Sequence, residues 1–228
     1  MKLTLKMLTE IASHEAIVCQ AYLDNAKPPN WTWSAGITSA SGIDVKQFIG
    51  KIQPMQDCID AYVDRLRIYA RAVDRVFEGY DLTEAQQTAA LSFHWNTGKI
   101  HKASWVTLWK IGKIDEARKS FMQWKIPASI IERRQKECDL FFKGVWASNG
   151  VGRVTEYTRL TKRNTPAWRS GVKVDVTKEL RQALRNHPAP IVKPKTLVRP
   201  KPTPVKAPPK GILTVLFQLL RQAFRKDT

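Results

Sequence analysis

Residues 14–36 read HEAIVCQAYLDNAKPPNWTWSAG, and this stretch decides the fold predicted for the chain. It carries two carboxylates nine positions apart, Glu15 and Asp24. Just before it, apolar residues recur at the spacing of a helix with one buried face, at Leu5, Leu8, Ile11 and Ala12. We therefore expect Glu15 at the C-terminal end of a helix and Asp24 in the polar turn that begins after residue 23.

The two surroundings favour different charge states. The helix dipole is negative at this end and the neighbouring Ile17 and Val18 are apolar, so both disfavour a charged carboxylate at Glu15. Asp24, in a solvated turn, is expected to stay ionised. A protonated acid beside an ionised carboxylate is the pair that cleavage of a glycosidic bond requires. The spacing alone is more typical of a helix-end glutamate and a turn aspartate without chemistry, so other residues have to decide.

Three motifs, in order, resemble the phage-type lysozymes and endolysins of glycoside hydrolase family 24. Residues 14–36 resemble that family's Glu, Tyr-x-Asp, Thr-x-Gly-x-Gly signature. Residues 89–98, AALSFHWNTG, resemble its Leu-x-Ser-Phe-x-Phe-Asn-x-Gly helix, and residues 130–137, IIERRQKE, its late Arg-Arg-x-x-Glu helix. The resemblance spans roughly residues 3–145, and it departs from the family at Ser34, where a glycine is usual, and at Ile37, where a histidine is frequent.

The resemblance implies a role for three site residues. Glu15 would be the general acid, Asp24 the carboxylate that orients or activates water, and Thr32 the residue beside that water. The interval of eight positions from Asp24 to Thr32 is longer than the family's. One guanidinium, from Arg133 or Arg134, would point toward Glu15 or Asp24, although both arginines equally fit a solvated helix surface.

The predicted activity is that of an endolysin, a muramidase that hydrolyses the β-1,4 bond between N-acetylmuramic acid and N-acetylglucosamine in peptidoglycan and so lyses the bacterial host. Two alternatives stay open. A lytic transglycosylase acts on the same bond, needs only the acid glutamate and forms an anhydro-sugar without water. A non-catalytic, cationic membrane-active or binding protein would use an inactive lysozyme-like scaffold. The joint presence of Glu15, Asp24 and Thr32 favours the hydrolase.

The predicted fold is α+β and mostly helical: a lysozyme-like domain of two lobes over residues 1–150, with a small antiparallel sheet within residues 17–45 and a cleft between the lobes. Helical spacing from Pro54, at the first helical position, to Phe77 predicts a long helix that links the lobes.

Other local signals complete this prediction. Capping boxes at Thr83-x-x-Gln86 and Ser129-x-x-Glu132 open helices that end at Gly98 and Gly144. His14 is expected at the surface. Trp31 and Trp33 would either stack on sugar rings or be buried.

Composition sets the cellular context. The 228 residues suffice for one core of about 150 residues and an appendage. Cys19, Cys58 and Cys138 are widely spaced, which predicts reduced, packed thiols, and the histidines have no ligand spacing, so we expect neither a metal nor a cofactor. No signal peptide or spanning segment is evident, so we expect a monomer made in the host cytoplasm that acts at the periplasmic cell wall after the membrane is permeabilised.

The net charge of +18 is unevenly distributed, because residues 1–150 carry +4 and residues 151–228 carry +14. We expect a basic extension over 151–187, packed on or following the domain, and a Pro/Lys-rich linker over 188–210, in which eight of 23 residues are proline. Residues 211–228 form a predicted basic amphipathic helix, which either lies in a membrane interface or docks on protein. The expected partners are peptidoglycan and, through the tail, an anionic membrane or lipopolysaccharide surface, with nucleic acid unlikely as a specific partner.

Overall fold

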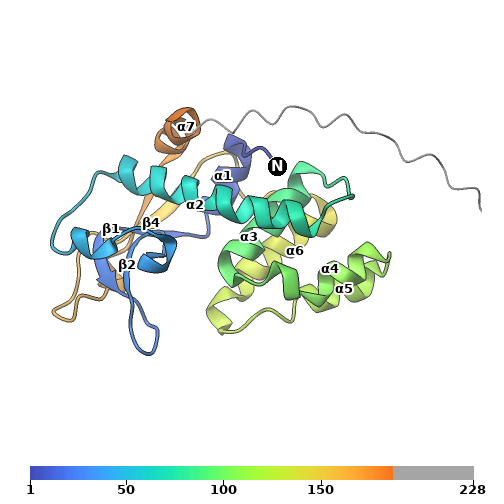
Figure 1. Cartoon of the computed structure of the whole chain (residues 1–228), viewed down its shortest axis with the longest axis horizontal. Coiled ribbons are helices and arrows are strands. Elements are labelled where there is room, and N and C mark those ends of the chain that lie inside the picture. Colours follow the sequence, from blue (N-terminus) through green and yellow to red (C-terminus); the bar gives the residue numbers. More distant parts are fainter. Residues whose placement is uncertain (187–228) are drawn as a thin grey trace, which may run out of the picture. The chain divides into compact units, whose positions relative to one another are not determined.

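The computed structural model describes residues 1–186, so the predicted linker and amphipathic helix, residues 188–228, lie outside the described part. The strands come in two groups that a run of helices separates along the chain, an order typical of an α+β fold (Figure 1). The helices are α1 Leu5–Ala12, α2 Met55–Val76, α3 Glu84–Thr97, α4 Ser104–Lys110, α5 Ile114–Phe121, α6 Ile131–Lys143 and α7 Thr177–Asn186. The strands are β1 Ala16–Leu23, β2 Trp31–Ser34, β3 Ile37–Thr38, β4 Arg153–Glu156 and β5 Val172–Asp175.

The first helix is present as predicted, but it ends at Ala12 rather than at Glu15. Thr4 caps α1 through its side chain, which accepts a hydrogen bond of 3.2 Å from the backbone N–H of Met7. The apolar face of α1, including Leu8 and Ile11, is buried. The chain then leaves the helix through a tight turn, in which the N–H of Glu15 donates to the Ala12 carbonyl over 2.9 Å. Glu15 therefore stands between α1 and β1, three residues beyond the end of the helix at which the sequence predicts it.

The long helix α2 connects the strands with the remaining helices. It packs against β1 and β2 near its start and against α3 further along (Figure 1). Its buried residues follow the helical spacing seen in the sequence: Cys58, Ile59, Tyr62, Val63, Leu66, Ala70 and Val73. Pro54 is the N-cap rather than the first helical residue, because its ψ of 144° is extended and not helical. The predicted link between the two lobes is confirmed.

The two predicted capping boxes had different outcomes. Thr83 and Gln86 form both bonds of a capping box at the start of α3. The prediction for Ser129 was wrong, since α6 begins at Ile131 with Ile130 as its N-cap and no side-chain cap. The carboxylate of Glu132 instead accepts from Lys136, one turn along the same helix. Gly98 and Gly144 both end their helices in the left-handed region, with φ of 66° and 69°.

The sheet is mixed: the antiparallel strands predicted within residues 17–45 are present as β1, β2 and β3, and β4, from outside that range, adds a parallel pair. Its five strands have the order β3-β2-β1-β4-β5. The pairs β1–β2, β2–β3 and β4–β5 are antiparallel, but β4 runs parallel to β1. The parallel pair arises because β4 returns to the sheet only after the chain has passed through helices α2 to α6. A strand whose partner lies more than a hundred positions away leaves no local signal of its direction.

Residues 151–186 pack on residues 1–150 within one compact unit. Helix α7 lies against α2 and α1, and it buries Leu180 and Ala183. Val154 in β4 and Val176 before α7 are fully buried as well. The stretch set apart in the sequence as a basic extension thus shares the hydrophobic core of the first 150 residues.

The core of the helical part is largely aromatic. Trp105 stacks edge-on against Phe93 and Phe141, with ring centroids 5.4 and 4.8 Å apart. Cys19, Cys58 and Cys138 are buried free thiols, as predicted. None of the helices in residues 1–186 combines the length and the apolar content that crossing a bilayer requires.

Candidate active site

The side chain of Glu15 contacts the guanidinium of Arg133, a residue far from it in the sequence. Arg133 Nη1, on α6, lies 2.9 Å from Glu15 Oε1, and both side chains are only 11% exposed. The contact is a close ion pair rather than an aligned hydrogen bond, since Glu15 Oε1 has no hydrogen-bond partner of acceptable angle. Of the two arginines considered in the sequence, Arg133 is the one that reaches the predicted acid.

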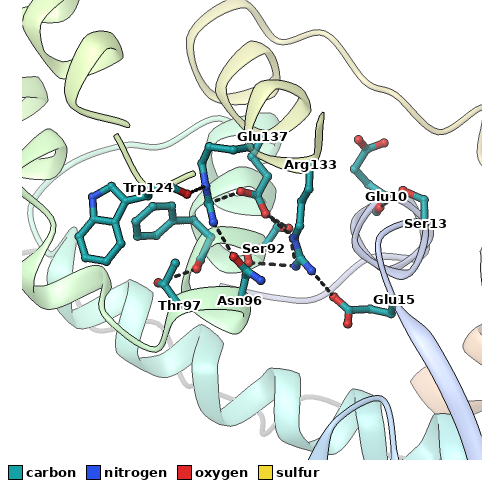
Figure 2. Close-up of polar contacts among 11 residues, drawn as sticks. Glu10, Ser13, Glu15, Ser92, Asn96, Thr97, Trp124, Arg133 and Glu137 are labelled. Atoms are coloured by element: carbon teal, nitrogen blue, oxygen red, sulfur yellow. Dashed lines mark hydrogen bonds and ion pairs between the residues drawn. The ribbon is translucent and has the colours of Figure 1, made fainter. Parts of the chain in front are cut away.

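Arg133 is itself held by a buried polar network between α3 and α6 (Figure 2). Its Nε donates to Glu137 Oε1 over 2.9 Å, and its Nη2 donates to the carbonyl and the hydroxyl of Ser92. The Ser92 hydroxyl donates in turn to Glu137 over 2.5 Å. Although burial alone would lower the pKa of Arg133, the charges of Glu15 and Glu137 raise it, so the guanidinium stays charged. The network therefore aims a fixed positive charge at Glu15.

Arg134 points into the helical core instead. It pairs with Glu137, donates to the Trp124 carbonyl over 2.8 Å and donates to Asn96 Oδ1 over 2.5 Å. Its guanidinium also lies 4.6 Å from the centre of the Phe93 ring. Arg134 is fully buried and does not reach either predicted catalytic carboxylate. Its contact with Asn96 fixes an amide at the edge of the Glu15 pocket.

Glu15 lines a pocket of about 230 Å³ between the sheet and the helices. The other lining residues come from the turn after β2 and from α2, α3 and α6: Ala35, Gly36, Tyr69, Trp95, Asn96 and Arg133. A second pocket of about 330 Å³ shares Gly36, Tyr69 and Trp95 with it, and a third of about 440 Å³ shares Asn96. Three adjoining pockets with Glu15 in the middle one make an extended groove, which suits a polymer rather than a small molecule.

Asp24 lies at the other end of β1 and is not among the residues that line the Glu15 pocket. Its carboxylate accepts from the backbone N–H groups of Ala26 and Asn30, over 3.0 and 2.8 Å, and from the Asn30 side chain over 3.2 Å. Burial alone would raise the pKa of Asp24, but these donors outweigh burial and lower it below its usual value. The turn therefore keeps Asp24 ionised, as the sequence predicts.

Thr32 is brought to Asp24 across the sheet. Thr32 pairs in register with Tyr22, and its hydroxyl lies 3.5 Å from Asp24 Oδ2 and 3.2 Å from the Asn30 carbonyl. The threonine is 2% exposed. Burial raises the pKa of Tyr22, and the charges of Asp24 and Glu15 raise it further. Asp24 and Thr32 are thus together, next to Tyr22.

Ser34 explains a departure from the family pattern. Its φ is +54°, in the left-handed region that glycine adopts without strain. The hydroxyl donates to the Cys58 carbonyl over 2.7 Å, and the residue is fully buried. This bond ties β2 to α2 and offsets part of the conformational cost. The backbone at this position needs a positive φ, which explains why glycine is usual there in the family, and Ser34 adopts the same conformation.

His14 corrects a prediction, since it is largely buried rather than at the surface. Burial first, and then the charges of Arg133, Lys136, Arg134 and Lys173, lower the pKa of His14 to about 3. The imidazole beside Glu15 is therefore neutral at physiological pH. The residues next to His14 in the sequence do not predict these cations, because the cations come from α6 and β5.

The sequence analysis did not predict the aromatic side of the groove, which Tyr69 and Trp95 form. Tyr69 and Trp95 line the Glu15 pocket, and their rings lie 5.0 Å apart in an edge-on arrangement. A signal existed for Tyr69, which follows Tyr62 by seven positions on the same helix stripe. Trp33, considered as a sugar platform, is 4% exposed and packs against Phe48 at 4.2 Å, so it belongs to the core. Trp31 is half-buried against the same core.

Comparisons with known proteins agree on one family. A model of the phage lysozyme family matches residues 12–137. A search of curated proteins gave no match. Among solved structures, the chain is similar to an endolysin from Escherichia coli O157:H7 phage FAHEc1, with 19% identity and a TM-score of 0.54 over 65% of this chain and 98% of that chain. It is also similar to a mutant of P22 lysozyme, with 19% identity and a TM-score of 0.52 over 63% of this chain and 99% of that chain.

The structural likeness concerns the fold, while the family match covers more than half of the sequence and includes both predicted carboxylates. The two agree with the motifs found in residues 14–36, 89–98 and 130–137. The chain therefore belongs to the phage lysozyme family and is a glycoside hydrolase that cleaves peptidoglycan.

Proposed function

We propose that this lysozyme is an endolysin that hydrolyses the β-1,4 bond between N-acetylmuramic acid and N-acetylglucosamine, with Glu15 as the general acid. The observation that carries the proposal is the position of Glu15, at the middle of the groove and in contact with Arg133. Because Arg133 faces Oε1, Oε2 is left to donate a proton to the leaving sugar oxygen. Tyr69 and Trp95 supply apolar faces on which pyranose rings pack.

In this proposal Asp24 acts as the ionised carboxylate that orients or activates water, and Thr32 helps to hold that water. Supporting features are the lowered pKa of Asp24 and the approach of the Thr32 hydroxyl to Asp24 Oδ2. An inverting reaction needs about 6.5–9.5 Å between the two carboxyl groups, which leaves room for the water. Asn96 adds a further polar group, because Arg134 occupies its Oδ1 and leaves Nδ2 as a donor toward the groove.

One observation keeps the lytic transglycosylase as a second candidate. The oxygens of Asp24 already accept from Ala26, Asn30 and Thr32, and Asp24 does not line the Glu15 pocket. A transglycosylase needs only the acid, because a hydroxyl of the sugar itself replaces the water. The hydrolase remains the better proposal, since the lowered pKa keeps Asp24 charged next to Thr32.

Mass spectrometry of the muropeptides released from purified peptidoglycan tests the proposal. Hydrolysis leaves reducing N-acetylmuramic acid ends, whereas a transglycosylase leaves 1,6-anhydro ends. Reducing ends on N-acetylglucosamine would move the cleaved bond to the other linkage and contradict the proposed specificity. Release of no fragments would support a non-catalytic protein on a lysozyme-like scaffold.

We also propose where and on what the protein acts. It is a monomer, made in the host cytoplasm, which reaches the periplasmic cell wall after the membrane is permeabilised and lyses the host. Residues 151–228 then carry it to an anionic membrane or lipopolysaccharide surface. The proposal is supported by the net charge of +14 in this part of the chain, and by nine exposed basic side chains within residues 151–186: Arg153, Arg159, Lys162, Arg163, Arg169, Lys173, Lys178, Arg181 and Arg185.

A further inference from the structure

Residues 151–186, here called the brace, hold the first end of β1. Strand β4 lies beside β1 (Figure 1) and runs parallel to it, with Thr155 paired to Ala16. The N–H of Thr155 donates to the carbonyl of Glu15 over 3.0 Å, and the N–H of Tyr157 donates to the carbonyl of Ile17 over 3.0 Å. The backbone that carries the proposed acid is therefore hydrogen-bonded directly to the brace.

The brace also holds the other end of β1. The N–H of Leu23 donates to the carbonyl of Asn164 over 2.8 Å, one position before Asp24. Asn164 belongs to the loop between β4 and β5, and the loop is closed on itself by a bond of 2.8 Å from the N–H of Thr161 to the carbonyl of Thr165. Asn164 has a φ of +59°, so the loop depends on a left-handed residue at the contact.

The brace is firmly attached elsewhere, so it is able to resist movement of β1. Before it, the buried carboxylate of Glu10 accepts from the N–H groups of Ala147 and Ser148, over 3.1 and 2.7 Å. Within it, Gly171, just before β5, lies so close to two side chains that an added Cβ would stand 2.7 Å from Thr155 and 2.6 Å from Tyr157. At its C-terminal end, its own helix α7 packs on α2.

From these contacts we propose that the brace is a positioning element for catalysis, which fixes the relative placement of Glu15 and Asp24 by hydrogen-bonding to both ends of β1. The proposal rests on the function proposed above. The family match ends at residue 137, and the phage FAHEc1 endolysin is covered almost completely by 65% of this chain. The brace thus follows the region matched by the family, and its hydrogen bonds reach Glu15 and Leu23, the residue before Asp24. Misplacement of catalytic groups by about 1 Å costs up to about 100-fold in rate.

A pair of substitutions at Asn164 tests the proposal in the full-length protein. Asn164→Val puts a β-branched residue at a φ of +59° and should displace the loop carbonyl, whereas the matched control Asn164→Gly adopts this φ without strain. We expect Asn164→Val to lower kcat on solubilised peptidoglycan strands by about 10- to 100-fold with KM unchanged. We expect faster amide hydrogen exchange in residues 16–24 of that variant and wild-type behaviour of Asn164→Gly.

Gly171→Ala provides a second variant should Asn164→Val fail to fold, because its Cβ would press on Thr155 and Tyr157 at the Glu15 end of β1. Faster exchange in residues 16–24 together with an unchanged kcat would overturn the proposal, as would no change in either quantity. The exchange data do not depend on activity. If the wild-type protein released no fragments, the proposed function would fail, while unchanged exchange in both variants would independently refute the brace.

Discussion

Arg133 Nη1 and Glu15 Oε1 lie 2.9 Å apart, although 118 positions separate the two residues in the sequence. The same guanidinium donates to Glu137 and to Ser92, so it connects the turn before β1 with α3 and α6 (Figure 2). Both partners are shielded from water, which strengthens their interaction and makes the loss of either one costly. This ion pair joins the sheet side of the groove to its helical side.

Replacement of Arg133 tests this connection. Arg133→Gln should leave two shielded carboxylates, Glu15 and Glu137, without their shared cation and should lower the free energy of unfolding by about 3–5 kcal/mol. The matched control is Lys136→Gln, on the same helix, whose ion pair with Glu132 is exposed at 43% and 81% and should therefore add little to stability. Denaturant unfolding of both variants gives the comparison. Equal losses in the two variants would contradict the structural role of Arg133.

Glu15→Gln should abolish most of the turnover without loss of the fold. The amide fills the same volume but has no proton to give to the leaving oxygen, and general acid catalysis contributes about 10²–10⁴-fold. The rate is measured as clearing of permeabilised cells and as muropeptide release, with circular dichroism as the check on folding. Clearing at the wild-type rate would remove Glu15 from the mechanism.

Asp24→Asn separates the two candidate reactions. The amide keeps an acceptor for the donors of Ala26 and Asn30 but loses the charge, so water-dependent cleavage should fall steeply. Asp44→Asn is a suitable control, because Asp44 accepts from the Lys46 N–H in a similar turn ahead of the short helix Val45–Phe48. Full activity of Asp24→Asn, with anhydro ends among the products, would favour the transglycosylase.

His14 predicts a pH dependence of stability. Its pKa is about 3 in the folded protein, because of burial and nearby cations, against 6.5 as the ordinary value. Between these values the unfolded chain binds a proton that the folded protein excludes, so stability is lost as the pH falls from about 6.5 toward 3. His14→Gln should reduce this loss, and His101→Gln, at an exposed site, should not. Thermal unfolding at pH 7 and pH 4 measures the difference; the same slope in His14→Gln and the wild type would refute it.

Removal of residues 190–228 tests the proposed membrane role. This truncation keeps the whole compact unit and removes nine basic residues and one acidic residue, a loss of eight positive charges. The shortened protein should digest purified peptidoglycan normally but sediment much less with vesicles of anionic lipid, and binding of the full-length protein should weaken as salt screens the charges. Neutral vesicles serve as the control. Equal binding of both proteins to anionic vesicles at low salt would contradict this role.

Much of the fold was predictable because its signals are local. The buried stripe of α2 and the capping box of Thr83 depend on residues three to seven positions apart, and both were confirmed. The parallel strand β4 was not predictable in this way. Its pairing with β1 spans more than 130 positions. The four residues of β4 are too few to indicate from their sequence which strand they pair with or in which direction.

The outcome at Ser129 shows the limit of a local rule. Ser129 and Glu132 have the spacing of a capping box, yet Glu132 accepts from Lys136, and a 3-10 turn at Ala128–Ile130 replaces the cap. The Glu132 carboxylate could accept from the backbone at Ser129 or from the Lys136 side chain, and the sequence does not indicate which bond forms. Burial of His14 was missed for a related reason, because Lys173 and Arg133 reach it from distant elements.

The sequence by itself determined the groups whose partners are neighbours in the chain. Asp24 is kept ionised by Ala26 and Asn30, within six positions, and Glu15 follows the end of a helix marked by its own spacing. Only the tertiary structure decided which arginine reaches Glu15, which aromatic rings line the groove, and that both ends of β1 are held by residues 151–186. The physical reason is that hydrogen bonds within a turn require only local backbone angles, whereas contacts across the domain depend on how all the buried faces pack together.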